Sequence, residues 1–439
     1  MKKMISSNKK NPFKLIVIDP AHFHAALLQK NMYKQISSVV HIYAAVKDDI
    51  NDYLNYISEF NNRLDNPTSW QTKVYSGYDF LEKMAEEKAG SITILAGNNK
   101  KRIQYIQKAV SAGINILADK PLCINKSDFK LLKTVFSIAE DKSVLLYDIM
   151  TERSEITNIL QKELCNNSGL FGELIRGTAE QPAIIKGSVH HFYKSVNNIP
   201  IIRPEWYFDI RQTGEGIVDV TSHLIDLAHW TCFPGQIIDY HKDIKIVNAD
   251  HWPTEIDKPQ FKKVTQKDNF PVFLQPYLKN DILNIYANGY IIYTLKGYHI
   301  KVKIEWNYEA EQGKGDRHYS VIKGTKANII IRQGNTAMPE LYVEAPQGQS
   351  ADQLRNPLRR VISSLQASYP GLDFEKEVNQ WRIIIPAKYR TSHEAHFTDV
   401  VERYLQYLID GKLPDWEIPN MLSKYFITTS ALELINKKS

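Results

Sequence analysis

Residues 13–20 of the chain read Phe-Lys-Leu-Ile-Val-Ile-Asp-Pro. This short apolar run ends at an Asp-Pro pair, which is typical of a strand buried on both faces of a parallel sheet. Comparable runs recur along the N-terminal third of the chain with helical stretches between them: the runs span 39–46, 91–96, 114–118 and 143–147, and the helices 24–34 and 100–112. This alternation predicts a Rossmann-like, doubly wound parallel sheet over residues 1–150. The long polar stretch 48–70 is interpreted as an insertion after the second strand.

The pattern changes after about residue 172. The expected elements are then a strand at 173–179, strands of alternating polarity within 282–308 and 319–332, and closing helices at 396–408 and 421–435. Such alternation is typical of an antiparallel sheet with one solvated face. Residues 151–439 are therefore predicted to form a C-terminal domain for substrate binding and oligomerisation. This domain is expected to contain a mostly antiparallel open sheet with flanking helices. The predicted fold class is therefore an α/β domain followed by an α+β domain.

The composition argues against several classes of protein. A net charge of +6 on 439 residues is mild, and no basic run is interleaved with aromatic residues, so no nucleic-acid partner is expected. The three cysteines are far apart and lack a CxxC pair, which argues against a disulfide framework or structural zinc and favours a reducing compartment, the cytoplasm. No apolar run reaches about 18 residues, so no membrane span is expected. None precedes Phe13, so no signal peptide is expected.

The first candidate for chemistry is Asp119-Lys120-Pro121, which directly follows the apolar run 114–118. Ligands of open parallel sheets bind beyond the carboxyl ends of the strands. A lysine there can place its ammonium group near a nicotinamide and a substrate hydroxyl. Pro121 restricts the two preceding residues to an extended turn and makes a cis peptide bond an option. The ordinary alternative is an exposed lysine in a strand-to-helix turn, because lysine is usually at the surface.

The second candidate is the segment from Gly214 to Trp230, which reads Gly-Glu-Gly-Ile-Val-Asp-Val-Thr-Ser-His-Leu-Ile-Asp-Leu-Ala-His-Trp. On a helix, Asp219, His223 and Asp226 share one face, separate from an apolar face. A carboxylate four residues from a histidine can fix its tautomer and hold its pKa near neutrality, as a general base requires. The two glycines would let the backbone approach a ligand closely at the start of the helix. The alternative is an amphipathic helix with an ordinary i, i+4 pair on its outer face.

Other candidates are weaker. His22-Phe23-His24 follows the first apolar run, where a phosphate-binding turn is expected. Two adjacent histidines are too few ligands for a metal, so no metal site is expected. His190-His191 and Arg203-Pro-Glu-Trp206-Tyr207 offer aromatic planes and polar groups for a sugar, although local packing and loop anchoring explain them equally well.

Together these motifs resemble those of the Gfo/Idh/MocA oxidoreductases. The stretch 116–121 is similar to that family's strand ending in Glu-Lys-Pro, with Asp119 in place of Glu. Phe171-Gly172-Glu173 is similar to its Gly-Glu entry into the second domain, and 214–226 to its Gly-rich turn followed by Asp-x-x-x-His-x-x-Asp. The closing segment Gly411-Lys-Leu-Pro414 is also similar, so the matches span most of the chain.

The resemblance implies roles for particular residues. Lys120, Asp219 and His223 would be catalytic, with His223 as the acid/base, Asp219 as its partner, and Lys120 in contact with nicotinamide and substrate. The reaction would be a reversible oxidation of a ring hydroxyl of a sugar or glycoside by NAD or NADP. The substrate-binding residues would be Lys120, His191, Arg203, Trp206, Asp219 and His223.

The chain departs from the family at the cofactor turn. The usual Gly-x-Gly-x-x-Gly is absent, and 19–24 read Asp-Pro-Ala-His-Phe-His, which is similar to a divergent branch with its own C-terminal domain. Lys47 favours a 2′-phosphate, whereas Asp48 or Asp49 suits NAD, so both cofactors stay open. The family's usual histidine after its fourth strand appears as a lysine, at 100 or 101. The cofactor-binding residues implied are Asp19, Ala21, His22, Phe23, His24, Lys47, Gly97, Asn98, Asn99, Asp119 and Lys120.

Three functions are compatible with these features. The leading one is a sugar or glycoside dehydrogenase or ketoreductase. The second is a glycosidase-like enzyme in which NAD stays bound and net redox is zero, and the third is a non-catalytic nucleotide and sugar sensor. The enzymatic hypotheses require the turn 119–121 and the helix face 219–223 to converge on one cleft. A sheet with one exposed apolar face also favours a homodimer or homotetramer.

Overall fold

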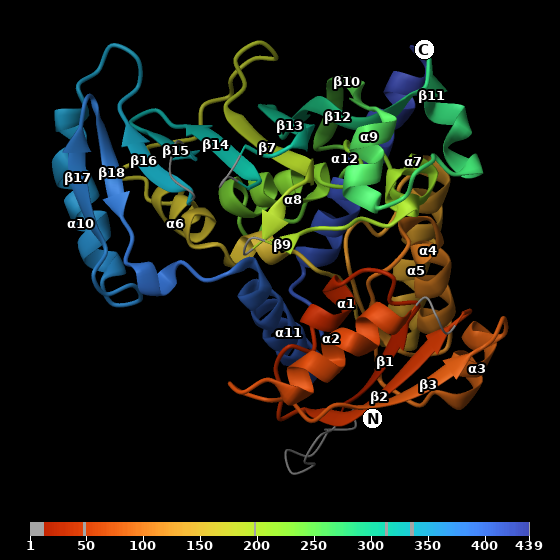
Figure 1. Ribbon diagram of the computed structural model, residues 1–439. Helices are drawn as coiled ribbons and strands as arrows, with labels where there is room; N and C mark the ends of the chain where they lie inside the picture. The colour runs from red at the N-terminus through yellow and green to blue at the C-terminus, as the bar shows by residue number, and fades with distance from the viewer. Residues whose placement is uncertain (1–12, 47–49, 197–198, 312–314, 334–337, 439) are drawn as a thin grey trace. The chain divides into compact units, whose positions relative to one another are not determined.

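The structure is a computed structural model that describes residues 13–46, 50–196, 199–311, 315–333 and 338–438. These residues form two compact units (Figure 1). The first comprises the described residues up to Thr151 together with Ser392–Ile418, and the second comprises Glu152–Thr391 and the described residues from Pro419 onward. A single boundary near residue 150 was expected. The structure keeps that boundary but adds a second segment, residues 392–418, to the N-terminal unit.

The first unit is built on a six-stranded sheet whose strands are all parallel. Its strands are β1 (Phe13–Ile18), β2 (Ile36–Ala44), β3 (Gln71–Ser76), β4 (Ile92–Leu95), β5 (Asn115–Ala118) and β6 (Leu146–Asp148). Their order is β3-β2-β1-β4-β5-β6, so the doubly wound sheet is confirmed. The order reverses between β1 and β4, and this is the position at which such sheets bind ligands.

The helices of the first unit correct two expectations. They are α1 (His24–Leu27), α2 (Asn51–Asn62), α3 (Phe80–Glu87), α4 (Asn99–Ser111), α5 (Lys126–Lys142) and α11 (His393–Asp410). The helix expected over 24–34 is a single turn, α1. The stretch 48–70 is not a mere polar insertion, because α2 lies in it as the crossover from β2 to β3. Only Tyr53 and Ile57 of α2 are buried. Its apolar residues have helical spacing, but the Asn, Asp, Ser and Glu residues between them make the stretch polar overall.

The late helix α11 belongs to this first unit. The ring of Phe397 lies 4.7 Å from the ring of His24, and the Tyr404 hydroxyl donates a hydrogen bond of 3.0 Å to the Leu145 carbonyl. Tyr404 also stacks on Tyr147 of β6 with ring centroids 6.0 Å apart. The segment expected only as a closing helix therefore completes the packing of the N-terminal sheet.

The second unit is built on a ten-stranded, mostly antiparallel sheet, as expected. Its strands are β7 (Ile184–Tyr193), β10 (Ile244–Ile256), β11 (Leu278–Lys279), β12 (Ile282–Leu295), β13 (Tyr298–Glu309), β14 (Arg317–Lys323), β15 (Asn328–Arg332), β16 (Glu340–Glu344), β17 (Asp373–Glu377) and β18 (Gln380–Ile384). They run in the order β10-β12-β13-β7-β14-β15-β16-β18-β17, with β11 beside β12 and only β13 and β7 parallel. Residues 173–179 form no strand and make only the bridges Leu174–Gly324 and Gly177–Pro182.

Helices of the second unit pack on this sheet, and α6 and α8 lie beside its central strands (Figure 1). The helices are α6 (Ile156–Cys165), α7 (Ile210–Thr213), α8 (Thr221–Cys232), α9 (Lys258–Thr265), α10 (Arg355–Leu365) and α12 (Glu417–Asn436). The shorter pieces are the 3-10 helices η2 (Thr151–Ser154), η3 (Glu205–Phe208), η4 (Val272–Tyr277), η5 (Ala351–Leu354) and η6 (Ala387–Tyr389), and the pair β8 (Ser195–Val196) and β9 (Ile199–Pro200). No described helix has an apolar stretch of the length that a bilayer requires.

A buried charge cluster joins α8 to α12. The Asp226 carboxylate lies 2.6 Å from Nε of Arg153 and 2.9 Å from Nζ of Lys424, and it accepts a hydrogen bond of 3.1 Å from Asn420. Asp226, Arg153 and Lys424 are all almost fully buried. The interpretation that Asp226 shares one face with Asp219 and His223, separate from the buried apolar face, is therefore wrong, because Asp226 points into the core of the second unit.

Candidate active site

The turns that follow β1, β4 and β5 meet at the carboxyl edge of the parallel sheet. The His22 amide donates to the Ala96 carbonyl (3.2 Å), and the Tyr105 hydroxyl donates to the Asp19 carboxylate (3.0 Å). A Cβ added at Gly97 would lie 2.3 Å from the Asp19 carbonyl oxygen, so only glycine allows these two turns to pack so closely.

The structure thus gathers nearly all of the residues expected to bind cofactor on this edge. They are Asp19, Ala21, His22, Phe23, His24, Gly97, Asn98, Asn99, Asp119 and Lys120. Lys47 lies outside the described residues.

Asp119 is the buried anion of this edge. Its Oδ2 lies 2.9 Å from Nδ1 of His24 and 4.0 Å from Nδ1 of His22. Burial alone would raise the pKa of the Asp119 carboxyl, but the charge and hydrogen bond of His24, with Arg102 nearby, hold that pKa well below its usual range. Burial, followed by the charge of His24, lowers the pKa of His22 well below its ordinary value. His22 is therefore a neutral imidazole at neutral pH.

Lys120 follows directly, and its amide donates to the Asp119 carboxylate at 2.9 Å. The Lys120–Pro121 bond is cis, one of the two forms that the sequence allows. Arg102 of α4 donates to the Pro121 and Gly97 carbonyls at 2.8 and 2.9 Å, and so fixes the two turns relative to each other. Arg102 was not expected here, because within the helical stretch 100–112 it resembles any solvent-facing basic residue.

In the second unit, Asp219 and His223 lie at the start of α8. The helix begins at Thr221, so Asp219 lies in the preceding turn rather than on the helix itself. Its amide donates to the Glu215 carbonyl (3.1 Å), and the His223 amide donates to the Val220 carbonyl (3.0 Å). Both side chains are partly exposed, as residues that meet a substrate must be.

The glycines of this segment serve the fold. Gly214 has φ +83° and ends α7 (Ile210–Thr213), and a Cβ on Gly216 would lie 1.8 Å from the Ala287 carbonyl oxygen of β12. The close approach attributed to a ligand is therefore made by a strand of the sheet. Between the two glycines, the Glu215 carboxylate lies 2.5 Å from Nδ1 of His251 on β10, which also ties the turn to the sheet.

Replacing Gly216 by alanine is expected to destabilise the protein, because the new methyl group must displace the backbone of β12. Overpacking of this kind typically lowers the free energy of unfolding by about 1–3 kcal/mol. Urea unfolding at pH 7 measures the change. The control is Gly315→Ala, where an added Cβ meets nothing within 4 Å. Equal stability of both variants would contradict this explanation for Gly216.

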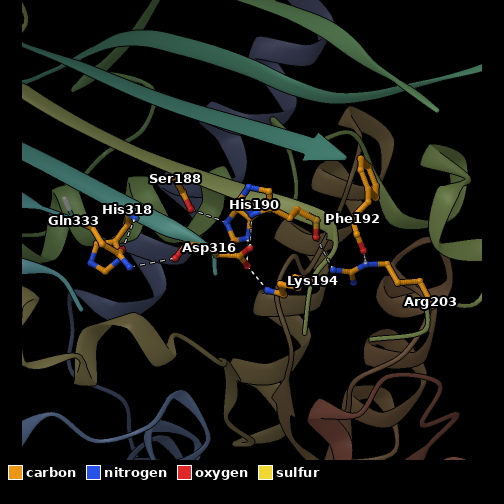
Figure 2. A network of polar contacts seen from close by, with 9 residues as sticks. Ser188, His190, Phe192, Lys194, Arg203, Asp316, His318 and Gln333 are labelled. Atoms are coloured by element: carbon orange, nitrogen blue, oxygen red, sulfur yellow. Dashed lines mark hydrogen bonds and ion pairs between the residues drawn. The ribbon is translucent and has the colours of Figure 1, made fainter. Parts of the chain in front are cut away.

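A polar network centred on Asp316 lies at the end of β7 (Figure 2). The Asp316 carboxylate lies 2.9 Å from Nδ1 of His190 and 3.3 Å from Nδ1 of His191, and Lys194 also pairs with it. Burial alone would raise the pKa of Asp316, but the charge of His190 and the hydrogen bonds of both histidines hold it far below its usual range. Nε2 of His190 is 2.6 Å from the Ser188 hydroxyl. Asp316 was not expected, since no pattern in the sequence links it to His190 and His191, 126 and 125 positions earlier.

The expected substrate residues of this region differ in their surroundings. His191 is buried against Asp316. Arg203 donates to the Phe192 and His191 carbonyls (2.7 and 3.0 Å), as Figure 2 shows for Phe192, and its guanidinium lies over the ring of Tyr207. Trp206 is partly exposed on η3. The hydrogen bonds of Arg203 are therefore made mainly to the protein backbone, whereas Trp206 presents a partly exposed aromatic ring.

The family follows from the C-terminal part of the chain. A family model described as "Putative oxidoreductase C terminal domain" matches residues 160–436, more than half of the chain. The chain belongs to the Gfo/Idh/MocA oxidoreductases. A crystal structure of a "putative oxidoreductase" from Parabacteroides merdae is 50% identical, with a TM-score of 0.95 over 98% of this chain and 99% of that one.

More distant Gfo/Idh/MocA structures share the fold. A levoglucosan dehydrogenase in complex with NADH and L-sorbose is 12% identical, with a TM-score of 0.61 over 97% of both chains. A 3-ketoreductase from Actinomadura kijaniata in complex with TDP-benzene and NADP is 12% identical, with a TM-score of 0.56 over 96% of both chains. No curated protein sequence matches the chain.

Proposed function

We propose that the protein is an NAD- or NADP-dependent oxidoreductase that moves a hydride to or from a carbinol carbon of a sugar or glycoside. The observation that carries the proposal is the gathering of Lys120, Asp119 and the β1 turn at the carboxyl edge where the strand order reverses. Dinucleotides bind doubly wound sheets at this point. The distant structures with the same fold were solved with NADH or NADP, and one of them with levoglucosan.

The side chains of this edge fit a dinucleotide. Imidazoles of His22 and His24, the Asn98 amide and the Lys120 ammonium are hydrogen-bond donors, and an anionic diphosphate and a carboxamide oxygen both need donors. Side-chain donors here would replace the backbone amides of the missing glycine-rich turn. When bound, the nicotinamide accepts or supplies the hydride.

The chain's own residues would handle the proton and the oxygen. His223 would take the hydroxyl proton as the hydride leaves, and return it in the reverse direction. Asp219 would hold the imidazole in one orientation, and the Lys120 ammonium would stabilise negative charge on the substrate oxygen. Trp206, Arg203 and His191 would bind the sugar ring. Asp316 is an addition to this set, because a carboxylate accepts hydrogen bonds from sugar hydroxyls.

The test uses Lys120→Met, which removes the charge and keeps the length of the side chain. Loss of one charged hydrogen bond should weaken NADH or NADPH binding by about 10- to 100-fold. Oxidation of a panel of sugars and glycosides should fall further, since Lys120 also acts on the substrate oxygen. Fluorescence titration of both nucleotides, and the mass and absorbance of any nucleotide that copurifies, are the measurements.

The control is Lys130→Met, on the exposed surface of α5 in the same unit, which should change neither quantity. Wild-type protein that binds neither nucleotide would overturn the proposal. Bound nucleotide with cleavage of glycosides and no net NADH formation would indicate the glycosidase-like reaction instead. Bound nucleotide with no reaction on any sugar or glycoside would indicate a sensor.

A further inference from the structure

Three potential metal ligands from two separate turns face one point. They are His22 and His24 after β1, and Asp119 after β5. One donor atom from each lies within 4.8 Å of the other two. His24 Nδ1 and Asp119 Oδ2 are 2.9 Å apart, and His22 Nδ1 is 4.0 Å from the same oxygen. The sequence supplied two of these ligands, and the fold adds the third.

The spacing of these atoms suits a small cation. In a tetrahedral zinc site, metal–ligand distances of about 2.0–2.2 Å place donor atoms about 3.4 Å apart. The two distances to Asp119 Oδ2, 2.9 and 4.0 Å, lie on either side of that value. Both imidazoles and the carboxylate would share one coordination sphere once Nδ1 of His22 releases the 3.3 Å hydrogen bond that it accepts from the His24 amide.

The surroundings are those of an accessible site with a fixed anchor. The Asp119 side chain is 7% exposed, and its second oxygen, Oδ1, accepts the Lys120 amide, which fixes the carboxylate. The His22 and His24 side chains are 26% and 14% exposed, so an ion can reach them from solvent. Hydrogen bonds that orient the ligating carboxylate are a regular feature of metal sites.

We propose that His22, His24 and Asp119 form a three-ligand site for a divalent transition-metal ion of the zinc class. Two imidazoles and one carboxylate bind ions of this class more favourably than they bind Mg²⁺ or Ca²⁺, which prefer oxygen ligands. Three protein ligands leave at least one coordination position open, as in zinc sites that bind an exogenous ligand. The open position would take an anionic oxygen.

The identity of that oxygen rests on the proposed function. The turn after the first strand is where a doubly wound sheet receives the diphosphate of a dinucleotide. Here the turn 19–24 lacks glycines and packs against the Asp119 carboxylate, which repels phosphate. A bound divalent cation reverses the sign of the local charge. It would therefore supply positive charge for the diphosphate, beside the side-chain donors of this edge.

Metal binding is tested without nucleotide. Protein stripped with chelator is dialysed against Zn²⁺, Co²⁺ or Mg²⁺, and the bound metal is measured by mass spectrometry. We expect one equivalent of Zn²⁺ or Co²⁺, no Mg²⁺, and Co²⁺ visible bands of the intensity typical of a four- or five-coordinate ion. Absence of bound Zn²⁺, or preference for Mg²⁺, overturns the site.

Matched variants locate the ion. His24→Ala and Asp119→Asn should each weaken Zn²⁺ binding at least tenfold, and the control His41→Ala, on β2 of the same unit, should not. Circular dichroism verifies that each variant is folded. If His24→Ala is unfolded, Asp119→Asn, which keeps the side-chain shape, tests the site on its own. Unchanged Zn²⁺ binding in a folded variant of either ligand overturns the assignment.

The role in diphosphate binding has its own measurement. NADH affinity should rise at least tenfold when the stripped wild-type protein is loaded with Zn²⁺, and should not respond to Zn²⁺ in Asp119→Asn. If the wild-type protein binds both Zn²⁺ and NADH but Zn²⁺ does not change the NADH affinity, the role of the metal in diphosphate binding is overturned. No NADH binding under any condition overturns the proposed function as well, whereas the zinc site is judged by the metal data alone.

Discussion

Turnover by the His223→Ala variant is expected to be lower than that of the wild-type protein by roughly 10²- to 10⁴-fold, the range that a general acid/base contributes. The substrate hydroxyl would lose the group that accepts its proton, whereas the residues assigned to the dinucleotide all lie in the other unit. Affinity for NADH or NADPH should therefore stay within about twofold of the wild-type value.

The measurement pairs steady-state rates on the best sugar substrate with nucleotide titration of the same samples. His241→Ala is the control, because His241 is an exposed histidine of the same unit. Wild-type turnover by His223→Ala would remove His223 from the mechanism. Loss of nucleotide binding in that variant would show that its effect is not confined to the chemical step.

The second large effect is expected for stability. Replacing Asp226 by alanine leaves two cations, Arg153 and Lys424, buried without their shared carboxylate. Breaking a buried ion pair by removing one partner typically costs about 3–5 kcal/mol. We expect a loss of that size in the free energy of unfolding at pH 7, as measured by urea denaturation.

The pH dependence gives an independent check on Asp226. Burial alone would raise its pKa, but Arg153 and Lys424 hold it far below its ordinary value. A depressed carboxyl pKa contributes stability above the unfolded-state pKa of about 3.9, and that contribution is lost as the pH falls below it. The acid-induced loss of stability should therefore be smaller in Asp226→Ala than in the wild-type protein.

Asp268→Asn is the control for charge removal, because its partner Lys262 is at the surface and such pairs contribute little. A change below about 1 kcal/mol is expected for it. A similarly small change for Asp226→Ala would show that the buried cations find other partners.

The elements that could be predicted are those whose sequence carries its own burial signal. β1, β4 and β5 are mostly apolar and almost fully buried, which is typical of the central strands of a parallel sheet. α2 was missed because its helically spaced residues Tyr53, Ile57 and Phe60 stand in a stretch that the surrounding Asn, Asp, Ser and Glu residues make polar overall. The strand expected at 173–179 does not form, because its backbone is paired only through the two isolated bridges Leu174–Gly324 and Gly177–Pro182.

The candidate site shows the same division. Lys120 and His223 could be singled out because their flanking residues form short motifs. The partners of His24 and His190 could not, because Asp119 lies 95 residues and Asp316 lies 126 residues away along the chain. Asp226 was misplaced because helical spacing shows which residues share a face but not whether that face points to solvent or to the core. Its buried partner Lys424 is 198 residues away along the chain.

The return of residues 392–418 to the first unit has a consequence for how the chain acquires its structure. The N-terminal sheet leaves the ribosome early, but the helix that covers part of it is synthesised only after about 240 further residues of the other unit. Until then the surface meant for Phe397 and Tyr404 is uncovered. No single cut in the gene separates the two units. Any exchange of the first unit between relatives must therefore carry both of its segments, the N-terminal one up to Thr151 and Ser392–Ile418.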